Sequence, residues 1–315
     1  SYVSKNRSIT DYNGFDDISF LDFFGLKAFL SGKILEWNTE FKGDISTFNY
    51  ERFAHANRYR LGFKKKKNVP FLGEAEANLF AAYRDRVWNG SLGETDIYTS
   101  YGGFLEKTGI KKVIKQDVGY LYRIGLANYK ADSYNKKNIS GLWRGSLYAG
   151  FNHSYLIWKK NERKTMNKFH TRYTAIDVNP GMRYNSYLDF SYYAYENGSS
   201  QKIVGIKSGP ILTLGRLEKK FFDYSKFSVL LGTKFKDGGS PFDFDEVVDL
   251  GTLELGLTQQ LIGPVLLNAE YEFNIDGNSE YFGEIINSRF EARLQRRSYD
   301  VGIYYNPIKS LGGIE

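Results

Sequence analysis

Cysteine is absent from the 315 residues, and proline occurs only six times. Without a thiol the chain cannot form a disulfide scaffold, a thiolate metal site or a cysteine nucleophile. Long apolar runs are also missing, because glycine and proline interrupt even the stretch from Leu261 to Leu267, whereas a membrane-spanning helix requires roughly 18 apolar residues. The sequence therefore excludes a bundle of membrane helices and leaves open a membrane protein built from strands.

A signal peptide is not recognisable at the start of the chain, which opens at Ser1. Since an outer-membrane protein must be exported, we expect the sequence to be a mature form or an excerpt of a longer chain. Barrels of this length commonly form one closed unit, so residues 1–315 are predicted to be a single domain.

Aromatic residues, in contrast, are abundant: they make up 17% of the chain, with 25 Tyr and 24 Phe. Tyrosine at this level suits girdles at two membrane interfaces, where one end of the ring is apolar and the other wet. The formal net charge of +7 favours an anionic partner, which could be nucleic acid, lipid phosphate or an acidic glycan.

Alternation of apolar and polar residues is clearest between residues 250 and 306. Leu253, Leu255 and Leu257 alternate with polar residues, a turn follows at 261–264, and the alternation resumes over 267–274. Such a period of two predicts strands with one apolar face. A soluble sandwich also alternates, but the strand length, the charge on the second face and the aromatic content favour an outer-membrane barrel.

The same pattern recurs along most of the chain. We expect an all-β, transmembrane antiparallel β-barrel with roughly 14 to 16 strands. The predicted strands include 24–30, 35–41, 55–63, 75–83, 97–105, 118–129, 143–151, 188–194, 204–214, 227–235, 253–258, 267–274, 289–295 and 299–305. A long loop is predicted over 159–174, and Pro210 predicts an edge, a bulge or a seam, because proline cannot donate to a ladder.

Histidine is too scarce to favour catalysis. Only His55, His153 and His170 occur, whereas a barrel lipase or acyltransferase needs a serine or carboxylate beside a histidine. His153 and Ser154 are adjacent, but neighbours on a strand point to opposite faces. We therefore predict that the protein is not an enzyme and has no cofactor.

Acidic residues crowd the segment from Asp237 to Asp249, together with Asp243, Asp245 and Glu246. Oxygen ligands at this density could hold Ca²⁺, although the spacing does not match the twelve-residue calcium loop. The favoured interpretation is a solvated acidic loop, and no metal site is predicted.

Two basic clusters, Lys64 to Lys67 and Lys111 with Lys112 and Lys115, are interpreted as turns between strands. Nucleic-acid binding requires such charges on one face with aromatics that stack on bases, so nucleic acid is not an expected partner. Solvated turns are the simpler interpretation, and binding to anionic lipid head groups is the second.

Arginine falls on the polar face of several predicted strands, at Arg123, Arg144, Arg289 and Arg293. In a closed barrel these side chains would line the lumen, where a guanidinium can bind phosphate or carboxylate with two hydrogen bonds. Pairing with lumen acids is the favoured alternative, and substrate binding is the other. The candidate acids are Glu254, Glu270, Glu272 and Glu291.

Residues 237–245 (DGGSPFDFD) and 249–264 (DLGTLELGLTQQLIGP) resemble a C-terminal domain of cyanobacterial outer-membrane proteins, and residues 299–307 and 311–315 fit the same family. That family looks like the cyanobacterial version of the lipopolysaccharide-assembly barrel, also known as the organic-solvent-tolerance protein. The resemblance implies an outer-membrane protein that receives lipopolysaccharide from periplasmic bridge proteins and releases it sideways into the outer leaflet. A general diffusion porin is the alternative function, and a soluble β-rich binding domain is a third.

The chain departs from proteobacterial members of that family in three ways: it has no cysteine, it is too short for their 26 strands, and no N-terminal periplasmic domain is recognisable. The first two put a plug lipoprotein partner in question. If lipid leaves sideways, the predicted seam lies where the first and last strands meet. Its expected residues are Leu26 and Ala28 on one side and Val301 and Ile303 on the other.

Overall fold

The protein is seen in a computed structural model that describes residues 26–34, 37–48, 54–70, 73–84, 87–113, 116–132, 138–160, 180–215, 217, 220–296, 299–308 and 311–314. The strands are β1 (Leu26–Ile34), β2 (Trp37–Phe48), β3 (Ala54–Val69), β4 (Gly73–Arg84), β5 (Ile97–Val113), β6 (Gln116–Asp132), β7 (Ile139–Lys159), β8 (Gly181–Tyr195), β9 (Ser200–Leu214), β10 (Ser225–Gly238), β11 (Gly251–Ile262), β12 (Val265–Asn274), β13 (Ile285–Gln295), β14 (Asp300–Asn306) and β15 (Leu311–Ile314). Two short 3-10 helices, η2 (Gly90–Leu92) and η3 (Asp243–Asp245), lie in loops.

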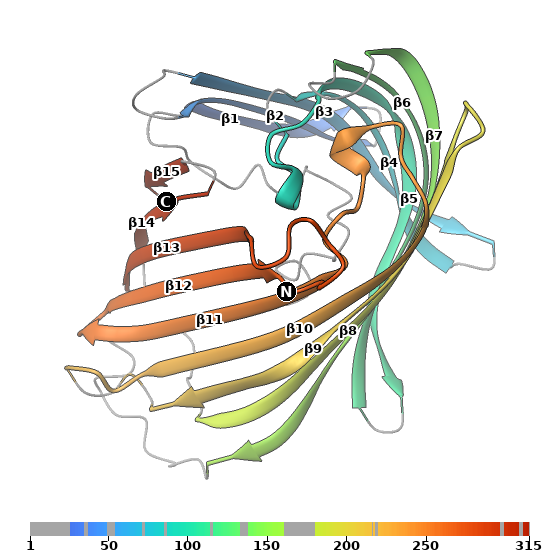
Figure 1. The fold of residues 1–315 in the computed structure, drawn as a ribbon. Coiled ribbons are helices and arrows are strands. Elements are labelled where there is room, and N and C mark those ends of the chain that lie inside the picture. Colours follow the sequence, from blue (N-terminus) through green and yellow to red (C-terminus); the bar gives the residue numbers. More distant parts are fainter. Residues whose placement is uncertain are drawn as a thin grey trace.

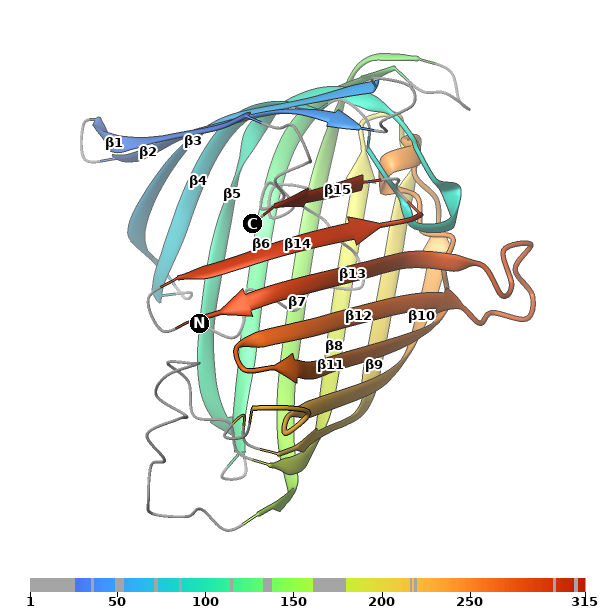
Figure 2. The same ribbon diagram turned by 90° about the vertical axis from the view of Figure 1, so that its left-hand side faces the viewer.

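Every strand pairs antiparallel with its neighbours in the chain, so β1 to β15 form one meander. The sheet curves round until β13–β15 return towards β1–β3, as Figures 1 and 2 show. The predicted all-β antiparallel fold is confirmed, and the fifteen strands fall within the expected range. Among the described residues, no helix has the length and apolar content needed to cross a membrane.

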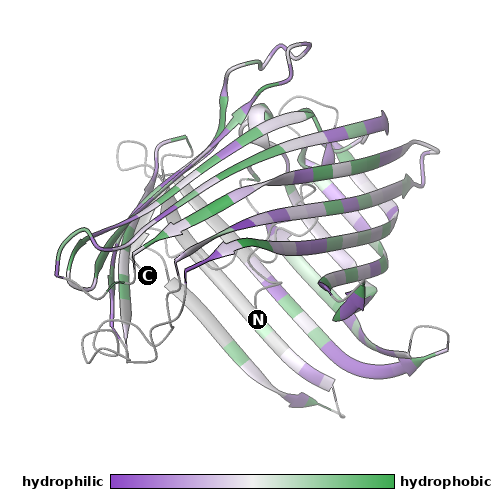
Figure 3. Ribbon diagram, turned by 90° about the horizontal axis from the view of Figure 1, so that it is seen from below, coloured by the Kyte–Doolittle hydropathy of each residue, from purple (hydrophilic) through white to green (hydrophobic). Residues whose placement is uncertain are grey.

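Apolar side chains point outward in rows that cross the sheet. Tyr122, Ala149, Phe190, Val204 and Phe235 are successive register partners from β6 to β10, and all but the alanine are large and exposed. The outward apolar face follows from the two-residue period of a strand. Figure 3 shows hydrophobic and hydrophilic residues alternating along the strands.

The other half of the sheet continues this outer face. Phe227, Leu257, Ala269, Phe290 and Tyr305 are register partners from β10 to β14, and again only the alanine is not a large exposed side chain. Polar residues occupy the alternate positions and point inward, so the inner face carries the charges. The outer face therefore has the composition predicted for contact with lipid.

The two edges of the sheet are β1 and β15, and no ladder joins them within the described part of the chain. The prediction that 299–305 is the last strand is wrong, because β15 follows β14 and pairs with its C-terminal half. Ile303 lies opposite Ile314, whereas Val301 precedes the part of β14 that β15 covers. Leu26 and Ala28 lie in β1, opposite Ile45 and Gly43 of β2.

The connections on either side of the sheet define two ends. We call the end that carries the β4–β5 and β10–β11 connections the loop end, and the other the opposite end. β5 and β6 each have 17 residues and β7 has 21, whereas about 9–11 residues cross the hydrocarbon layer. Part of these strands therefore extends beyond the thickness of a bilayer.

The basic clusters lie within strands near the opposite end, so their interpretation as turns is wrong. Lys64–Lys67 belong to β3 and pair with β4, while Lys111 and Lys112 belong to β5; Lys115 lies outside the described residues. Lys66, Lys67, Lys111 and Lys112 are exposed, so their charged ends reach water. Residues 161–174 of the predicted long loop are also outside the described residues.

Pro210 lies inside β9, which pairs with both β8 and β10, so it marks neither an edge nor a seam. The β9–β10 register is the same before and after it, so it marks no bulge either. The β9–β10 ladder instead passes from Ile211–Ser228 directly to Ser208–Leu231 and leaves out Gly209 and Pro210. A Cβ atom at position 209 would lie 1.9 Å from the carbonyl oxygen of Val229. Proline removes one ladder donor, and the adjacent glycine lets the two backbones approach at that place.

Candidate functional site: two loops on the inner face

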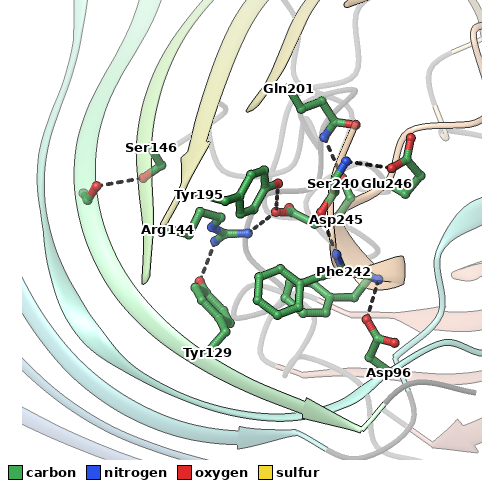
Figure 4. A network of polar contacts seen from close by, with 12 residues as sticks. Asp96, Tyr129, Arg144, Ser146, Tyr195, Gln201, Ser240, Phe242, Asp245 and Glu246 are labelled. Carbon is green, nitrogen blue, oxygen red and sulfur yellow. Dashed lines mark hydrogen bonds and ion pairs between the residues drawn. The ribbon is translucent and has the colours of Figure 1, made fainter. Parts of the chain in front are cut away.

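The β10–β11 connection turns inward and packs against the inner face of the sheet, as Figure 4 shows. Phe242 is 1% exposed and stacks on Phe244 with ring centroids 5.0 Å apart. Phe244 lies 4.5 Å from the ring of Tyr98 in β5, and Phe242 lies 5.7 Å from Tyr129 in β6. The two phenylalanines thus fix the loop to the wall through aromatic contacts.

Arg144 of β7 binds Asp245 of this loop. Its Nη1 atom donates to Asp245 Oδ2 at 2.5 Å, and the hydroxyl of Tyr195 donates to the same oxygen at 2.7 Å. The guanidinium lies 4.2 Å from the ring centroid of Tyr129, and the arginine and aspartate side chains are 1% and 8% exposed. Two charges are buried here because each has a charged partner and further hydrogen bonds.

Backbone atoms of the loop are held as well. Gln201 Nε2 donates to the carbonyl of Asp245 at 2.8 Å, and Asp96 Oδ2 accepts from the amide of Phe244 at 3.1 Å. Glu246 accepts from Lys236 at 2.5 Å and from the amide of Ser240 at 2.8 Å. The side chains of Gln201 and Asp96 are fully buried, so the loop replaces water as their hydrogen-bond partner.

The β4–β5 connection is the second inward loop, and it binds the first. Asn89 Nδ2 donates to the carbonyls of Asp243 and Glu246, both at 2.7 Å. Asp249 accepts from Ser91 at 3.0 Å (amide) and 2.5 Å (hydroxyl), and from Asn274 of β12 at 2.8 Å. These two loops form one unit, which we call the inner plug (residues 87–96 and 239–250).

The prediction of a solvated acidic loop is therefore wrong. Asp243 and Asp249 are buried, and Asp245, Glu246 and Asp249 each accept hydrogen bonds from protein groups. Asp237 lies apart from them in β10. Across the described residues, no group of three or more His, Asp or Glu side chains could hold a metal ion.

The other three arginines also lie on the inner face and pair with acids. Arg123 pairs with Glu106 of β5 and lies 4.8 Å from the ring of Phe104. Arg293 Nε lies 2.5 Å from Glu291, and Arg289 lies 3.7 Å from the same carboxylate. Glu291 was among the predicted acids, whereas Glu106 and Asp245 were not. Substrate binding by the four arginines stays a prediction.

Lys207 lies on the inner wall and was not among the predicted site residues. Lys207 of β9 forms an ion pair with Glu254 of β11 and lies 3.8 Å from Glu272 of β12. These two glutamates were expected to pair with arginine. The signal was present, because Lys207 occupies an inward position between the outward Ile206 and Ser208. Oppositely charged side chains thus pair along the inner wall from β9 to β13.

Two of the three histidines lie in strands of the sheet. His153 lies in β7 opposite Val118 and Ser186, and the hydroxyl of Ser154 donates to Asn185 at 2.8 Å. His55 lies in β3, and His170 is outside the described residues. The hydrogen-bond partner of Ser154 is therefore an asparagine, Asn185.

Comparison with known proteins gives one match. The family model DUF3769, described as a protein of unknown function, matches residues 6–315. No curated protein and no solved structure matches the chain. Since the match extends over nearly the whole length, the chain belongs to the DUF3769 family.

Proposed function

We propose that the chain is an outer-membrane β-barrel of a Gram-negative-type, cyanobacterial envelope, and that it passes lipopolysaccharide or another anionic glycolipid into the outer leaflet. The observation that carries the membrane part is the outer face, where rows of large apolar side chains are exposed from β6 to β14. Soluble monomers rarely expose contiguous apolar surface of this extent. In a bilayer the same surface is covered by acyl chains.

The aromatic residues support this placement. Tyr101 and Trp143 are exposed near the loop end with rings 5.7 Å apart, and Tyr155 and Trp158 are exposed near the opposite end. Trp143 and Trp158 lie on one strand, roughly 50 Å apart at about 3.3 Å per residue, which is about 35 Å along the membrane normal at a tilt of about 45°. The two tryptophans thus match the two interfaces of a bilayer.

The glycolipid part of the proposal is supported by the inner face and by the edges. Arg123, Arg289 and Arg293 lie on the inner wall, where a phosphate could exchange with their carboxylate partners. The edges β1 and β15 are the place where a lateral exit needs the fewest broken ladder bonds. Transport of this kind involves no covalent chemistry, and periplasmic bridge proteins and a plug lipoprotein are its candidate partners.

A general diffusion porin is the second candidate, and the inner plug is the observation that favours it. A porin needs a loop that narrows the lumen and carries charges opposite to those on the wall. The β10–β11 loop lies on the inner face. Its Asp245 Oδ2 atom lies 2.5 Å from Nη1 of Arg144 on the wall.

Two measurements on the full chain separate these functions. Depletion of the protein in cells should reduce glycolipid at the cell surface if the protein exports it. A large, steady, ohmic conductance in planar bilayers, without any loss of surface glycolipid on depletion, would instead support the porin. A stable monomer in plain buffer would contradict both and support the soluble β-rich binding domain.

A further inference from the structure

The outer wall contains a hollow of ≈ 390 Å³ across β2 to β5. These strands lie on the left of Figure 2. Phe41, Leu61, Ala81 and Tyr101 are successive register partners along one row of this wall. Ala81 is the one small side chain among them, and the hollow lies over it. The hollow is shallow and open to the outside, so an occupant would lie along the wall.

Tyrosine rings border the hollow on its loop-end side. Tyr59 and Tyr83 are register partners with ring centroids 6.1 Å apart, and Thr99 follows on β5. Arg60 also lines the hollow, but its side chain is buried and points inward from an alternate position, as that of Arg84 does. The outer surface of the hollow therefore offers aliphatic and aromatic groups with hydroxyls at one end, and no charge.

We infer that this hollow binds an acyl chain of a membrane lipid, with the ester end of the lipid beside Tyr59 and Tyr83. The inference rests on the proposed membrane location, because only then does the hollow face lipid. In a bilayer the side chains around an empty apolar hollow would lose van der Waals contacts. The flexible acyl chains of the surrounding lipids can restore these contacts by filling the hollow.

The strands around the hollow exclude a peptide as the occupant. β3 and β4 are paired on both sides along this region, so their backbone groups are already hydrogen-bonded. A peptide in the hollow would bring amides and carbonyls that find no partner in an apolar surrounding. An acyl chain has no such groups. The hydroxyls of the two tyrosines suit the ester region, where aromatic girdles meet the polar interface.

Native mass spectrometry of the full chain in detergent tests the site, with dioleoyl phosphatidylglycerol and dioleoyl phosphatidylcholine added as separate probes. We expect one tightly retained lipid. The substitution Ala81→Trp fills the hollow and should weaken retention about tenfold, and Ala81→Leu should give a smaller loss if the tryptophan variant does not fold. Ala269→Trp is the matched control, because Ala269 also lies in an outward row, between Leu257 and Phe290.

Both probes should be retained equally, since none of the outward side chains around the hollow is charged and Arg60 is buried. Equal retention by wild type and both Ala81 variants would overturn the inference, and so would a strong preference for phosphatidylglycerol, which would assign recognition to the head group. Insertion into lipid vesicles is measured in parallel. A protein that stays out of vesicles contradicts the proposed function, whereas one that inserts but binds lipid equally in all variants contradicts only this site.

Discussion

Arg144 in β7 holds Asp245, 101 residues further along the chain, by an ion pair of 2.5 Å. The pair joins the wall of the sheet to the inner plug, and both side chains are almost completely buried. Breaking a buried ion pair by removing one partner leaves an uncompensated charge, which costs about 3–5 kcal/mol.

Arg144→Ala is therefore expected to release the β10–β11 loop from the wall. The measurement is hydrogen exchange at residues 239–250, because the amides of Phe244 and Val247 donate to Asp96 and Gln201. Exchange at both amides should become faster in the variant. Arg123→Ala is the control, since its ion pair lies outside the plug and is more exposed. Unchanged exchange in Arg144→Ala would show that the aromatic contacts alone hold the loop.

Gly90→Ala tests the contact between the two loops. Gly90 has φ +51°, and a Cβ atom there would lie 2.0 Å from Asp249 Oδ2. We expect a loss of about 1–3 kcal/mol from backbone strain, together with loss of the Ser91–Asp249 hydrogen bonds. Chemical denaturation in detergent measures the change. Gly277→Ala should leave the midpoint unaltered, because no atom lies within 4 Å of its added Cβ.

Leu231→Arg distinguishes a bilayer from water around the outer face. Leu231 is 56% exposed and lies at the middle of β10. In water such a surface substitution changes stability by less than about 0.5 kcal/mol, whereas an arginine at the bilayer midplane costs about 2–4 kcal/mol. The measurement is urea unfolding from lipid vesicles. Asn278→Arg, in the exposed β12–β13 connection, should be neutral in either case, and a neutral Leu231→Arg would contradict the membrane location.

A disulfide across the two edges tests lateral release. Because β15 covers the end of β14, the scan pairs Leu26 or Ala28 of β1 with Gly312 of β15 rather than with Val301. The chain has no cysteine of its own, so a new pair has no native thiol to misconnect with. We expect the crosslink to block export of glycolipid and the barrel to stay folded. A crosslink between Ala149→Cys and Phe190→Cys, which are already register partners, should leave export intact. Full export through a verified β1–β15 crosslink would contradict the lateral route.

The strands could be predicted because apolar and polar residues alternate along consecutive positions of each strand. β15 was missed because Leu311-Gly-Gly-Ile314 contains two glycines and too few residues to display a period. Lys64–Lys67 were assigned to a turn because four charges in succession hide the alternation, although β3 continues through them. Local pattern thus predicts strands that alternate apolar and polar residues, and fails where a strand is very short or carries successive charges.

The inner plug could not be predicted for a different reason. Whether Asp245 is solvated or buried depends on Arg144 and Tyr195, which are distant in the sequence. One local signal was available, since Phe242 and Phe244 alternate with Asp243 and Asp245. Phenylalanine is usually buried, so two of them in one loop indicate that the loop packs against the protein. The inward position of the four arginines followed from alternation, but the choice of partner acid required the register.

Pairing only between successive strands lets each hairpin of the sheet form as soon as its second strand is available, without waiting for the rest of the chain. The inner plug, in contrast, depends on contacts between residues that are far apart in the chain. The hydrogen bonds from Asn89 to Asp243 and Glu246 join residues 154 and 157 positions apart, and β5 to β10 lie between them. Docking of the two loops therefore requires that β5 to β10 have already curved round, so a docked plug indicates that this part of the sheet is in place.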